Sequence, residues 1–389
     1  MTVHLARIGS LFERDELYGG EDEGLRFVAF ARAVAARCAE IEPDVLVAHD
    51  WQAALSLCVL RTVHDRGTSR GIGAVQVVHN NAHQGRYPAD LLPATGLPGE
   101  LFAPDGLEFH GELSLLKGGL AWADRIVAVS PSYAEELETP AFGEGLEGLY
   151  QFRSHRLVGI ANGIDAEAWD PGKDAALPLQ YDRRTPASRA QCREALIAEL
   201  GLDETDDGWL LGAVGRLAHQ KGWDVLAEAA EPLLERGASL VLLGSGDAEI
   251  ARELAALERR WPRQLSFRTG WNEALARRIY AGVDSILIPS RFEPCGLVQL
   301  LAQRYGALPI AHAVGGLRDT IRDGETGILF SPLGVDALLD AVEAGAALRQ
   351  RRGVVLVRAL LALDVSWNEP AERWEAELTH VAEDASERV

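Results

Sequence analysis

Cysteine is rare in this sequence and widely scattered. The four cysteines are Cys38, Cys58, Cys192 and Cys295, and no two of them form a CxxC pair. This spacing excludes a disulfide framework of the kind that small secreted domains use. We therefore expect a reducing environment and a cytoplasmic location.

Long apolar runs are also missing. No stretch approaches the roughly 20 apolar residues that a membrane-spanning helix needs, so we expect no membrane partner. Residues 1–7 have neither the basic start nor the apolar centre of a secretory signal, and their pattern predicts a strand.

Basic residues are outnumbered. Lys and Arg together number 38 against 58 Asp and Glu, which gives a formal net charge of −20. Sequence-independent binding to nucleic acid needs an excess of positive charge on one surface, so this balance argues against a nucleic-acid partner. An anionic substrate would have to be held by a few local cations, and basic residues in glycine-rich loops are therefore informative.

What is present is a globular chain long enough for two cores. Its 389 residues are 47% hydrophobic and 25% charged, and two domains are the natural expectation at this length. Apolar strand-like runs alternate with amphipathic helical runs, which is the pattern of an α/β fold with parallel sheets. The expected strands are 44–49, 74–79, 125–130, 157–161, 209–214, 239–243, 265–268, 285–289, 308–311 and 327–330.

The alternation predicts two Rossmann-type βα domains that face a central cleft. We predict an N-terminal domain over 1–168, an interdomain linker over 169–207, a C-terminal domain over 208–365 and a last helix over 366–389. The linker is rich in Pro, Asp and Arg, which is typical of a segment between domains. A cleft between two domains is the expected ligand site.

The most informative motif is Ser-Arg-Phe-Glu-Pro-Cys-Gly-Leu at 290–297, between an expected strand and a helical window. A carboxylate such as Glu293 at the carboxyl end of a parallel strand faces the ligand crevice. The backbone N–H groups at the start of the following helix suit an anion. The motif thus predicts a site for a sugar joined to a diphosphate, whereas Glu-Pro-Cys alone fits an ordinary strand-to-helix turn equally well. The amides expected at the ligand belong to Cys295, Gly296, Leu297 and Val298.

A second loop, over 214–222, follows the first strand of the second half. Arg216 and Lys221 lie five residues apart beside Gly215 and Gly222. Such a pair can clamp a pyrophosphate and neutralise the leaving group as a glycosidic bond breaks. The alternative is two solvated surface cations. The acidity of the chain and the place of the loop favour the clamp.

Polar residues also follow expected strands in the first half. Asp50 and His79 lie where a ligand crevice should be, and both can hydrogen-bond sugar hydroxyls. A lone histidine is more often structural, so neither signal is strong by itself. Asn162 begins an Asn-Gly pair, which taken alone is better explained as a plain turn.

Two further signals are weak. Trp271 follows Gly270, and it could stack on an adenine or equally be a buried tryptophan. The run Gly-Ser-Gly-Asp at 244–247 lacks the third glycine of a dinucleotide fingerprint, so it gives little support to a nicotinamide site.

The order of these motifs carries more information than any one of them. The matching segments are 49–51, 79–80, 84–85, 106–109, 130–134, 162–165, 216–217, 220–222, 289–297, 314–320 and 366–367. Together they resemble the bacterial and plant glycogen (starch) synthases over nearly the whole chain. The resemblance implies a GT-B-like fold, ADP-glucose as donor, glycogen or another α-1,4-glucan as acceptor, and transfer to the non-reducing end with retention. It implies neither a metal nor a cofactor.

The resemblance also implies roles. Arg216 and Lys221 would hold the diphosphate, and Glu293 would orient the glucose and stabilise positive charge at its anomeric carbon. His79, Asp50 and Asn162 would line the sugar site. The segment from Ser366 resembles the helix that crosses back to the N-terminal domain in this fold.

The sequence departs from the family pattern at its start. Family members begin with a strand and a Lys-X-Gly-Gly-Leu loop, whereas the match here begins near Val3. Roughly 80 residues would then be absent and the N-terminal domain incomplete. Lys-Gly-Gly-Leu at 117–120 precedes the strand at 125–130, so we interpret it as a structural helix. Val298 stands where a threonine is frequent.

Two alternatives remain open at this point. One is a catalytically impaired or inactive relative that binds a glucan or a nucleotide. The other is a nucleotide-sugar epimerase, which the run at 292–297 disfavours.

Overall fold

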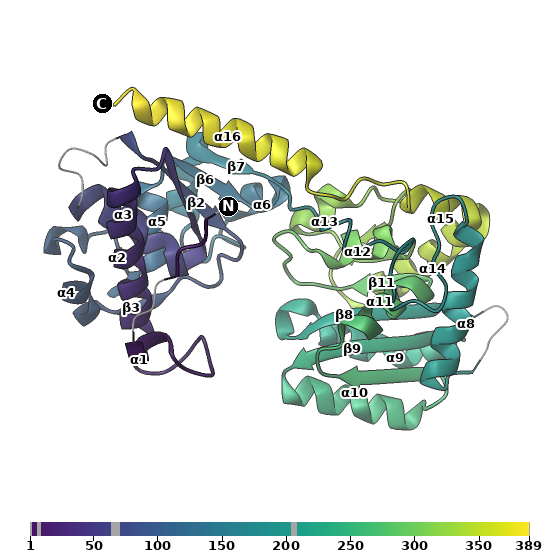
Figure 1. Cartoon of the computed structure of the whole chain (residues 1–389). Helices are drawn as coiled ribbons and strands as arrows, with labels where there is room; N and C mark the ends of the chain where they lie inside the picture. The colour runs from purple at the N-terminus through teal and green to yellow at the C-terminus, as the bar shows by residue number, and fades with distance from the viewer. Residues whose placement is uncertain (1, 6–8, 64–70, 204–207, 389) are drawn as a thin grey trace. The chain divides into compact units, whose positions relative to one another are not determined.

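The structure is a computed structural model that describes residues 2–5, 9–63, 71–203 and 208–388 (Figure 1). Its contacts divide the chain into two compact units. The first is Met1–Ile160 with Ala371–Val389, and the second is Ala161–Pro370. The domain limits predicted from the sequence stay a prediction.

The first unit is built on a four-stranded parallel sheet with the order β1-β2-β6-β7. These strands are Val45–His49, Gly73–Val78, Arg125–Ala128 and Leu157–Gly159. Every residue of β2 is buried, because a parallel sheet is covered on both faces and its inner strands are continuously apolar.

Helices cover this sheet closely. α3 (Asp50–Val63) packs against both α2 (Glu23–Ile41) and α5 (Leu115–Trp122). Gly119 allows the contact between α3 and α5, since a Cβ there would lie 2.7 Å from the Cβ of Ala54. The last helix, α16 (Asn368–Ser386), belongs largely to this unit, where Glu377 pairs with Arg125 at 2.9 Å.

The sequence did not predict all of the first unit. Residues 2–5 form neither helix nor strand, so the strand expected over 1–7 is wrong where it is described. A small antiparallel sheet of β3 (Arg86–Pro88), β5 (Glu112–Ser114) and β4 (Glu108–Phe109) was not expected. Strands of two or three residues are too short to show an alternating pattern.

The second unit is built on a six-stranded parallel sheet with the order β10-β9-β8-β11-β12-β13. The chain starts in the middle at β8, extends to one side through β10, and then returns to the other side of β8. The point between β8 and β11 is therefore a topological switch point, where α/β sheets bind ligands at the carboxyl ends of the strands. The strands are Leu210–Leu217 (β8), Ser239–Gly246 (β9), Leu265–Thr269 (β10), Ser285–Ile288 (β11), Leu308–His312 (β12) and Ile328–Phe330 (β13).

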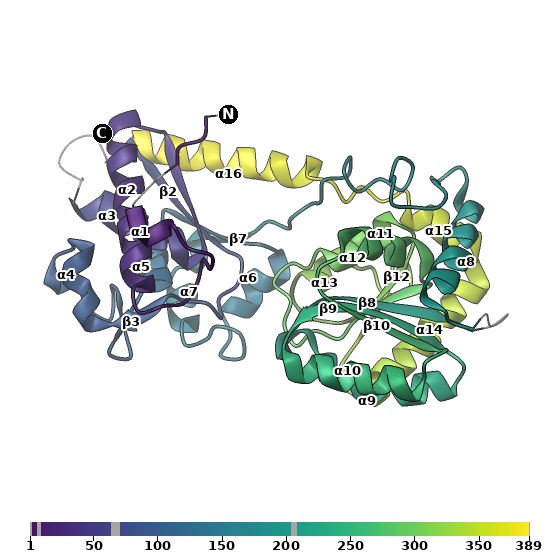
Figure 2. The same ribbon diagram turned by 60° about the horizontal axis from the view of Figure 1, so that its bottom comes forward.

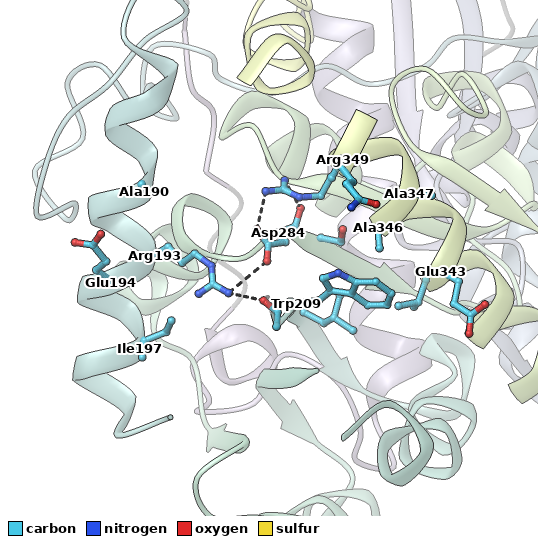
Figure 3. A pocket seen from close by; sticks show the side chains of 15 residues that line it. Ala190, Arg193, Glu194, Ile197, Trp209, Asp284, Glu343, Ala346, Ala347 and Arg349 are labelled. Carbon is cyan, nitrogen blue, oxygen red and sulfur yellow. Dashed lines mark hydrogen bonds and ion pairs between the residues drawn. The ribbon is translucent and has the colours of Figure 1, made fainter. Parts of the chain in front are cut away.

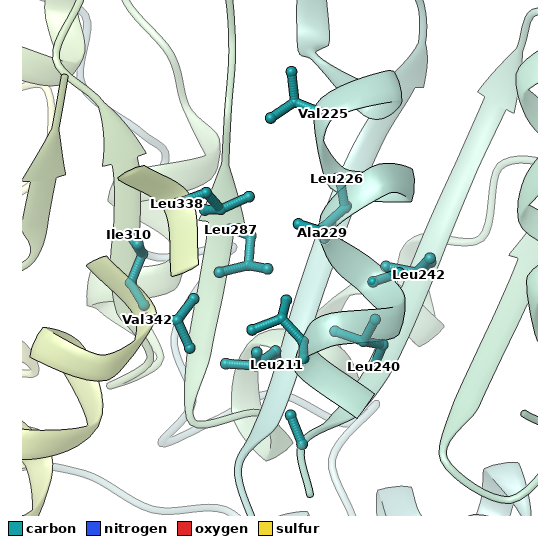
Figure 4. Close-up of a cluster of buried hydrophobic side chains, with 14 of the residues drawn as sticks. Leu211, Val225, Leu226, Ala229, Leu240, Leu242, Leu287, Ile310, Leu338 and Val342 are labelled. Atoms are coloured by element: carbon teal, nitrogen blue, oxygen red, sulfur yellow. The ribbon is translucent and has the colours of Figure 1, made fainter. Parts of the chain in front are cut away.

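Helices cover both faces of this sheet, and the pleat decides which residues they meet. Leu211 and Leu287 belong to the large core beneath α9 (Trp223–Glu235) and α14 (Val335–Arg352), as Figure 4 shows. The next residue along β8, Gly212, faces α11 (Glu273–Gly282), where its Cβ would lie 3.0 Å from Ile279. Figure 2 shows α9 and α10 (Ala248–Arg260) on one side of the sheet and α11 with α12 (Val298–Arg304) on the other.

The described part of the predicted linker, residues 169–203, packs within the second unit. It contains α8 (Arg189–Leu200), which lies against α11. The hydroxyl of Tyr181 donates to the carbonyl of Tyr305 at 2.8 Å. Arg304 donates to the carbonyls of Trp169 and Ala166 at 2.9 and 3.0 Å. These bonds fix the chain that leads away from Asn162.

Candidate active site

The loops after β8 and β11 meet at the switch point of the second unit. The backbone N–H of Arg291 donates to the carbonyl of Gln220 at 2.8 Å, and the amide of Gln220 returns a bond to the carbonyl of Phe292 at 3.1 Å. Arg291 also holds both carboxylate oxygens of Asp224, at 2.8 and 2.6 Å. The loops at 218–222 and 289–293 are therefore bonded to each other, and the surface that they form together is called the ledge.

Gly222 permits this close approach. Its φ is +69°, and a Cβ at this position would lie 1.9 Å from the carbonyl oxygen of Pro289. A side chain cannot be accommodated there without moving one loop away from the other. The glycine after Lys221 is thus a requirement of the ledge.

Lys221 and Glu293 are the centre of the ledge. The Lys221 Nζ atom lies 2.6 Å from Glu293 Oε2, and the hydroxyl of Ser290 donates to the same oxygen at 3.1 Å. The two side chains are 23% and 9% exposed, so the pair is only partly hydrated. A small cavity of about 40 Å³, lined in part by Gly215 and Val298, adjoins them.

Arg216 lies on the exposed side of the same loop. Its guanidinium donates to the side-chain oxygen of Gln220 at 3.4 Å, while its carbonyl accepts the indole N–H of Trp223 at 2.7 Å. Beside it, Gly215 has nothing within 4 Å of the place a Cβ would take. The loop therefore offers an anion two cations and open space next to the backbone.

The segment 295–298 forms the turn that leads into α12. Gly296 has a φ of +72°, and the side-chain amide of Gln299 donates to the carbonyls of Cys295 and Gly296 at 3.0 and 2.9 Å. Leu297 is the residue before the helix and is exposed, whereas Val298 is its first residue. The predicted amides are thus at a helix start.

Cys295 connects Asn162 to this turn. Its thiol is buried and accepts a hydrogen bond from the backbone of Asn162, and burial raises its pKa to about 11. A thiol with this pKa stays protonated near neutral pH, so the cysteine is a packing group there. The next residue, Gly163, lies against the carbonyl of Ser366, which its Cβ would approach to 2.2 Å.

Trp271 lies elsewhere along the same end of the sheet. It is 80% exposed, so the alternative of a buried tryptophan is wrong. The backbone N–H of Gly270 donates to the carbonyl of Gly244 at 3.1 Å, which places the Trp271 turn beside the end of β9. Asp247 caps α10 by accepting from the backbone of Glu249 at 2.7 Å, so the Gly-Ser-Gly-Asp run is the end of β9 followed by a helix cap.

Two residues at the site, Gly316 and His312, carried no predicted role. Gly316 donates its N–H to the carbonyl of Glu293 at 3.0 Å, and its Cβ would lie 2.4 Å from the carbonyl of Cys295. His312 bonds the carbonyl of Ser290 at 2.8 Å, and burial lowers its pKa. The sequence feature that could have indicated Gly316 was the glycine pair at 315–316, which follows the expected strand at 308–311.

The remaining predicted residues, Asp50 and His79, lie in the first unit. Asp50 opens α3 with a φ of +55°, and its carboxylate accepts the backbone N–H of His79 at 2.8 Å. His49 Nδ1 lies 2.9 Å from His79 Nε2, and the two rings are stacked. The ends of β1 and β2 thus bring three polar side chains together.

Lys117 has a structural role, as the sequence indicates. The residue is buried in α5, where its ammonium donates to the carbonyl of Pro104 at 2.6 Å and to that of Glu108. Burial lowers its pKa. An ammonium occupied in this way is not available to a substrate.

Comparison with known proteins decides the family. Residues 1–152 match the family described as starch synthase catalytic domain, and residues 209–346 match the group 1 glycosyl transferases. The glycogen synthase of Rhodopseudomonas palustris (strain TIE-1) is 44% identical over 370 residues, covering 91% of this chain and 75% of that protein. The chain belongs to the glycogen synthase family. The glycogen synthase of Methylocella silvestris is 45% identical over 340 residues, which cover 85% of this chain and 70% of that protein.

Solved structures agree with this assignment. The catalytic domain of starch synthase IV from Arabidopsis thaliana superposes with a TM-score of 0.88 at 30% identity, covering 96% of this chain and 80% of that one. A sucrose-phosphate synthase from Thermosynechococcus elongatus, at 19% identity and a TM-score of 0.61, shares the fold. This glycogen synthase family member thus has the GT-B fold and is a glucosyltransferase of the glycogen synthase type.

This assignment bears on the open alternatives. The match to glycogen and starch synthases argues against a nucleotide-sugar epimerase, and nothing in these relatives favours an inactive protein. No helix in the described part of the chain is long and apolar enough to cross a membrane.

Proposed function

We propose that the enzyme transfers glucose from ADP-glucose to the non-reducing end of an α-1,4-glucan such as glycogen, with retention at the anomeric carbon. The observation that carries the proposal is the Lys221–Glu293 pair, 2.6 Å apart at the switch point. A nucleotide sugar joins a dianion to a neutral polyol, and this site places an ammonium beside a carboxylate. The similar starch synthase IV domain has a solved structure bound to ADP and acarbose, which supports both substrate classes.

Lys221 and Arg216 bind the diphosphate in this proposal. Both follow β8, and Gly215 leaves the backbone open between them and the ligand. The backbone N–H groups over 295–298 add donors on the other side. As the bond to the sugar breaks, the two cations neutralise the charge that develops on the departing ADP. They supply the positive charge that a metal ion would otherwise provide, so no metal or cofactor is proposed.

Glu293 acts on the sugar. Its carboxylate orients the glucose hydroxyls and stabilises positive charge at the anomeric carbon in the transition state. The C1–O bond to the diphosphate breaks and its electron pair leaves with ADP. The acceptor 4-hydroxyl adds to the same face of C1, and its proton passes to the departing phosphate oxygen. No side chain becomes covalently attached, and retention follows from attack on the face that the donor leaves.

The other predicted residues bind the sugars and the base in this proposal. Asp50, His79 and Asn162 hydrogen-bond the hydroxyls of the sugars. Trp271, 80% exposed, stacks on the adenine. Nucleic acid and membranes are not partners in this proposal, and the four free, buried cysteines suit a cytoplasmic location.

A comparison of donors tests the proposal. ADP-glucose and UDP-glucose are assayed side by side with glycogen as acceptor, and the products are examined by NMR. We expect a higher kcat/KM with ADP-glucose and new α-1,4 linkages. A higher value with UDP-glucose contradicts the choice of donor, and release of free glucose without lengthening of the glucan contradicts transfer.

A further inference from the structure

The second unit contains a cavity at the opposite end of its sheet from Lys221 and Glu293. Its volume is about 980 Å³, and it lies between α8 and α14 (Figure 3). Trp209 and Asp284 line the cavity. They directly precede β8 and β11, so the cavity lies at the amino-terminal ends of these strands. The proposed glucosyl transfer uses only the carboxyl ends of the same strands, so this cavity has no role in it.

Positive charge gathers around one carboxylate in the cavity. Arg349 donates to Asp284 Oδ1 at 2.6 Å and to the backbone carbonyl of Asp284 at 3.0 Å. Arg193 enters from α8, where its guanidinium donates to the carbonyl of Gly208 at 2.7 Å and lies 3.7 Å from Asp284 Oδ2. Arg189, one turn earlier on α8, is buried behind the cavity and does not line it, and its guanidinium donates to the carbonyls of Tyr305 and Tyr280.

The single charge of Asp284 does not balance the guanidinium groups of Arg193 and Arg349, which both line the cavity. The Oδ2 atom of Asp284 also accepts the backbone N–H of Leu210 at 2.9 Å. Burial lowers the pKa of Arg349, and the charges of Arg189 and Arg193 lower it further against the opposing effect of Asp284. Excess positive charge in a poorly hydrated place is costly unless an anion compensates it. In a chain of net charge −20 such an excess is notable.

Among the described residues that line the cavity, the other two acidic side chains do not compensate this charge. Figure 3 shows the side chains of Glu194 and Glu343 pointing away from Arg193 and Asp284. Both glutamates are exposed, and Glu343 is paired with Arg236 at 2.5 Å outside the cavity. The middle of the cavity therefore faces guanidinium groups and the indole of Trp209.

We propose that this cavity binds a small metabolite that carries a phosphate group. The phosphate lies between Arg193 and Arg349, which approach from α8 and α14 and so offer N–H donors from two directions. Guanidinium groups match phosphate oxygens in pairs, and convergence from two helices suits a tetrahedral anion. The body of the ligand packs against Trp209 and the wall of Ala346 and Ala347 on α14.

Fluorine NMR of protein labelled with 5-fluorotryptophan tests the proposal at the site itself. Comparison with Trp209→Phe identifies the Trp209 signal, and Trp271→Phe identifies that of the proposed adenine site. Inorganic phosphate is the probe. We expect the Trp209 signal to shift in a saturable way. A shift of Trp271 without one of Trp209 places the anion in the nucleotide site alone and overturns the inference, whatever the outcome for glucosyl transfer.

Two matched variants locate the phosphate. Arg193→Gln keeps a donor for the carbonyl of Gly208 but removes the charge, and it should weaken the Trp209 response about tenfold or more. Arg358→Gln removes one charge from an exposed position of α15 (Val354–Leu360) and should leave the response unchanged. Equal affinities in wild type and both variants, or no Trp209 shift in the wild type, contradict the proposal.

Discussion

The Lys221 ammonium and the Glu293 carboxylate lie 2.6 Å apart and neutralise each other. Each charge is thus held in place by the other. A diphosphate that binds Lys221 must compete with Glu293 for the ammonium. In the proposed function, the carboxylate becomes free to act on the sugar when the ammonium is shared with the phosphates.

This pairing predicts different outcomes for the two residues. Glu293→Gln should lower kcat by about a hundredfold or more, because it removes the charge that stabilises the anomeric carbon. It should leave ADP affinity unchanged or raise it a few-fold, since a partly exposed ion pair contributes about 1 kcal/mol or less. Lys221→Met should weaken ADP binding about tenfold or more. Calorimetry with ADP and initial rates measure both, and equal losses of ADP affinity would show that the roles are not divided.

The histidine pair of the first unit predicts a pH dependence. With 2.9 Å between His49 Nδ1 and His79 Nε2, one of these nitrogens donates to the other, and protonation of the accepting nitrogen would break this bond. Partial burial lowers the pKa of His49 and the neighbouring His79 lowers it further, although Asp50 raises it. His49 is therefore held in its neutral form at neutral pH. Turnover should fall on acidification, below the ordinary histidine pKa of about 6.5.

Stability should change in the same direction. In this pH range the unfolded chain binds more protons at His49 than the folded one, so the free energy of unfolding decreases as the pH falls. His49→Asn places an amide near the position of Nδ1. This variant should keep its turnover at neutral pH, and its turnover should fall less on acidification than that of the wild type. His49→Phe should lower turnover at every pH. If turnover falls equally on acidification in the wild type and in His49→Asn, the histidine pair is not the source of the pH dependence.

The sequence predicted the parallel strands because such strands are buried and apolar along their whole length. The run at 285–288 is a clear case, since all four residues are buried. The antiparallel strands β3, β4 and β5 gave no such signal because they are short. Helix α2 was not predicted either, and its apolar stripe was the signal available.

The site was predicted less completely, for a physical reason. Lys221 and Glu293 are 72 residues apart, and each loop could be placed after a strand from local pattern alone. That these loops touch depends on β8 lying beside β11, which is a property of the strand order and not of either segment. The bond between the backbone of Asn162 and the thiol of Cys295 is likewise set by distant packing.

Gly222 should be intolerant of any side chain. Gly222→Ala places a methyl group 1.9 Å from the carbonyl of Pro289 in addition to the strain of a φ of +69°. We expect a loss of several kcal/mol in the free energy of unfolding, about 3 or more, and weaker ADP binding. Gly237→Ala is the matched control, since its φ is +86° but nothing lies within 4 Å. It should cost only about 1–2 kcal/mol. Similar losses for both, measured by urea unfolding, would mean that backbone strain alone explains the effect.

Lys117 should matter for stability and not for turnover. Lys117→Met fills the same space in α5 but leaves the carbonyls of Pro104 and Glu108 without their donor. Burying unsatisfied carbonyls costs about 1–3 kcal/mol, so the variant should unfold at lower urea concentration. Its kcat and its KM for ADP-glucose should stay close to the wild-type values, because the ammonium is turned into the protein. Lys173→Met, at a side chain that is 78% exposed, is the control and should change neither property. A large fall in kcat with unchanged stability in Lys117→Met would instead assign this lysine to the substrate, and the structural interpretation of the Lys-Gly-Gly-Leu run would be wrong.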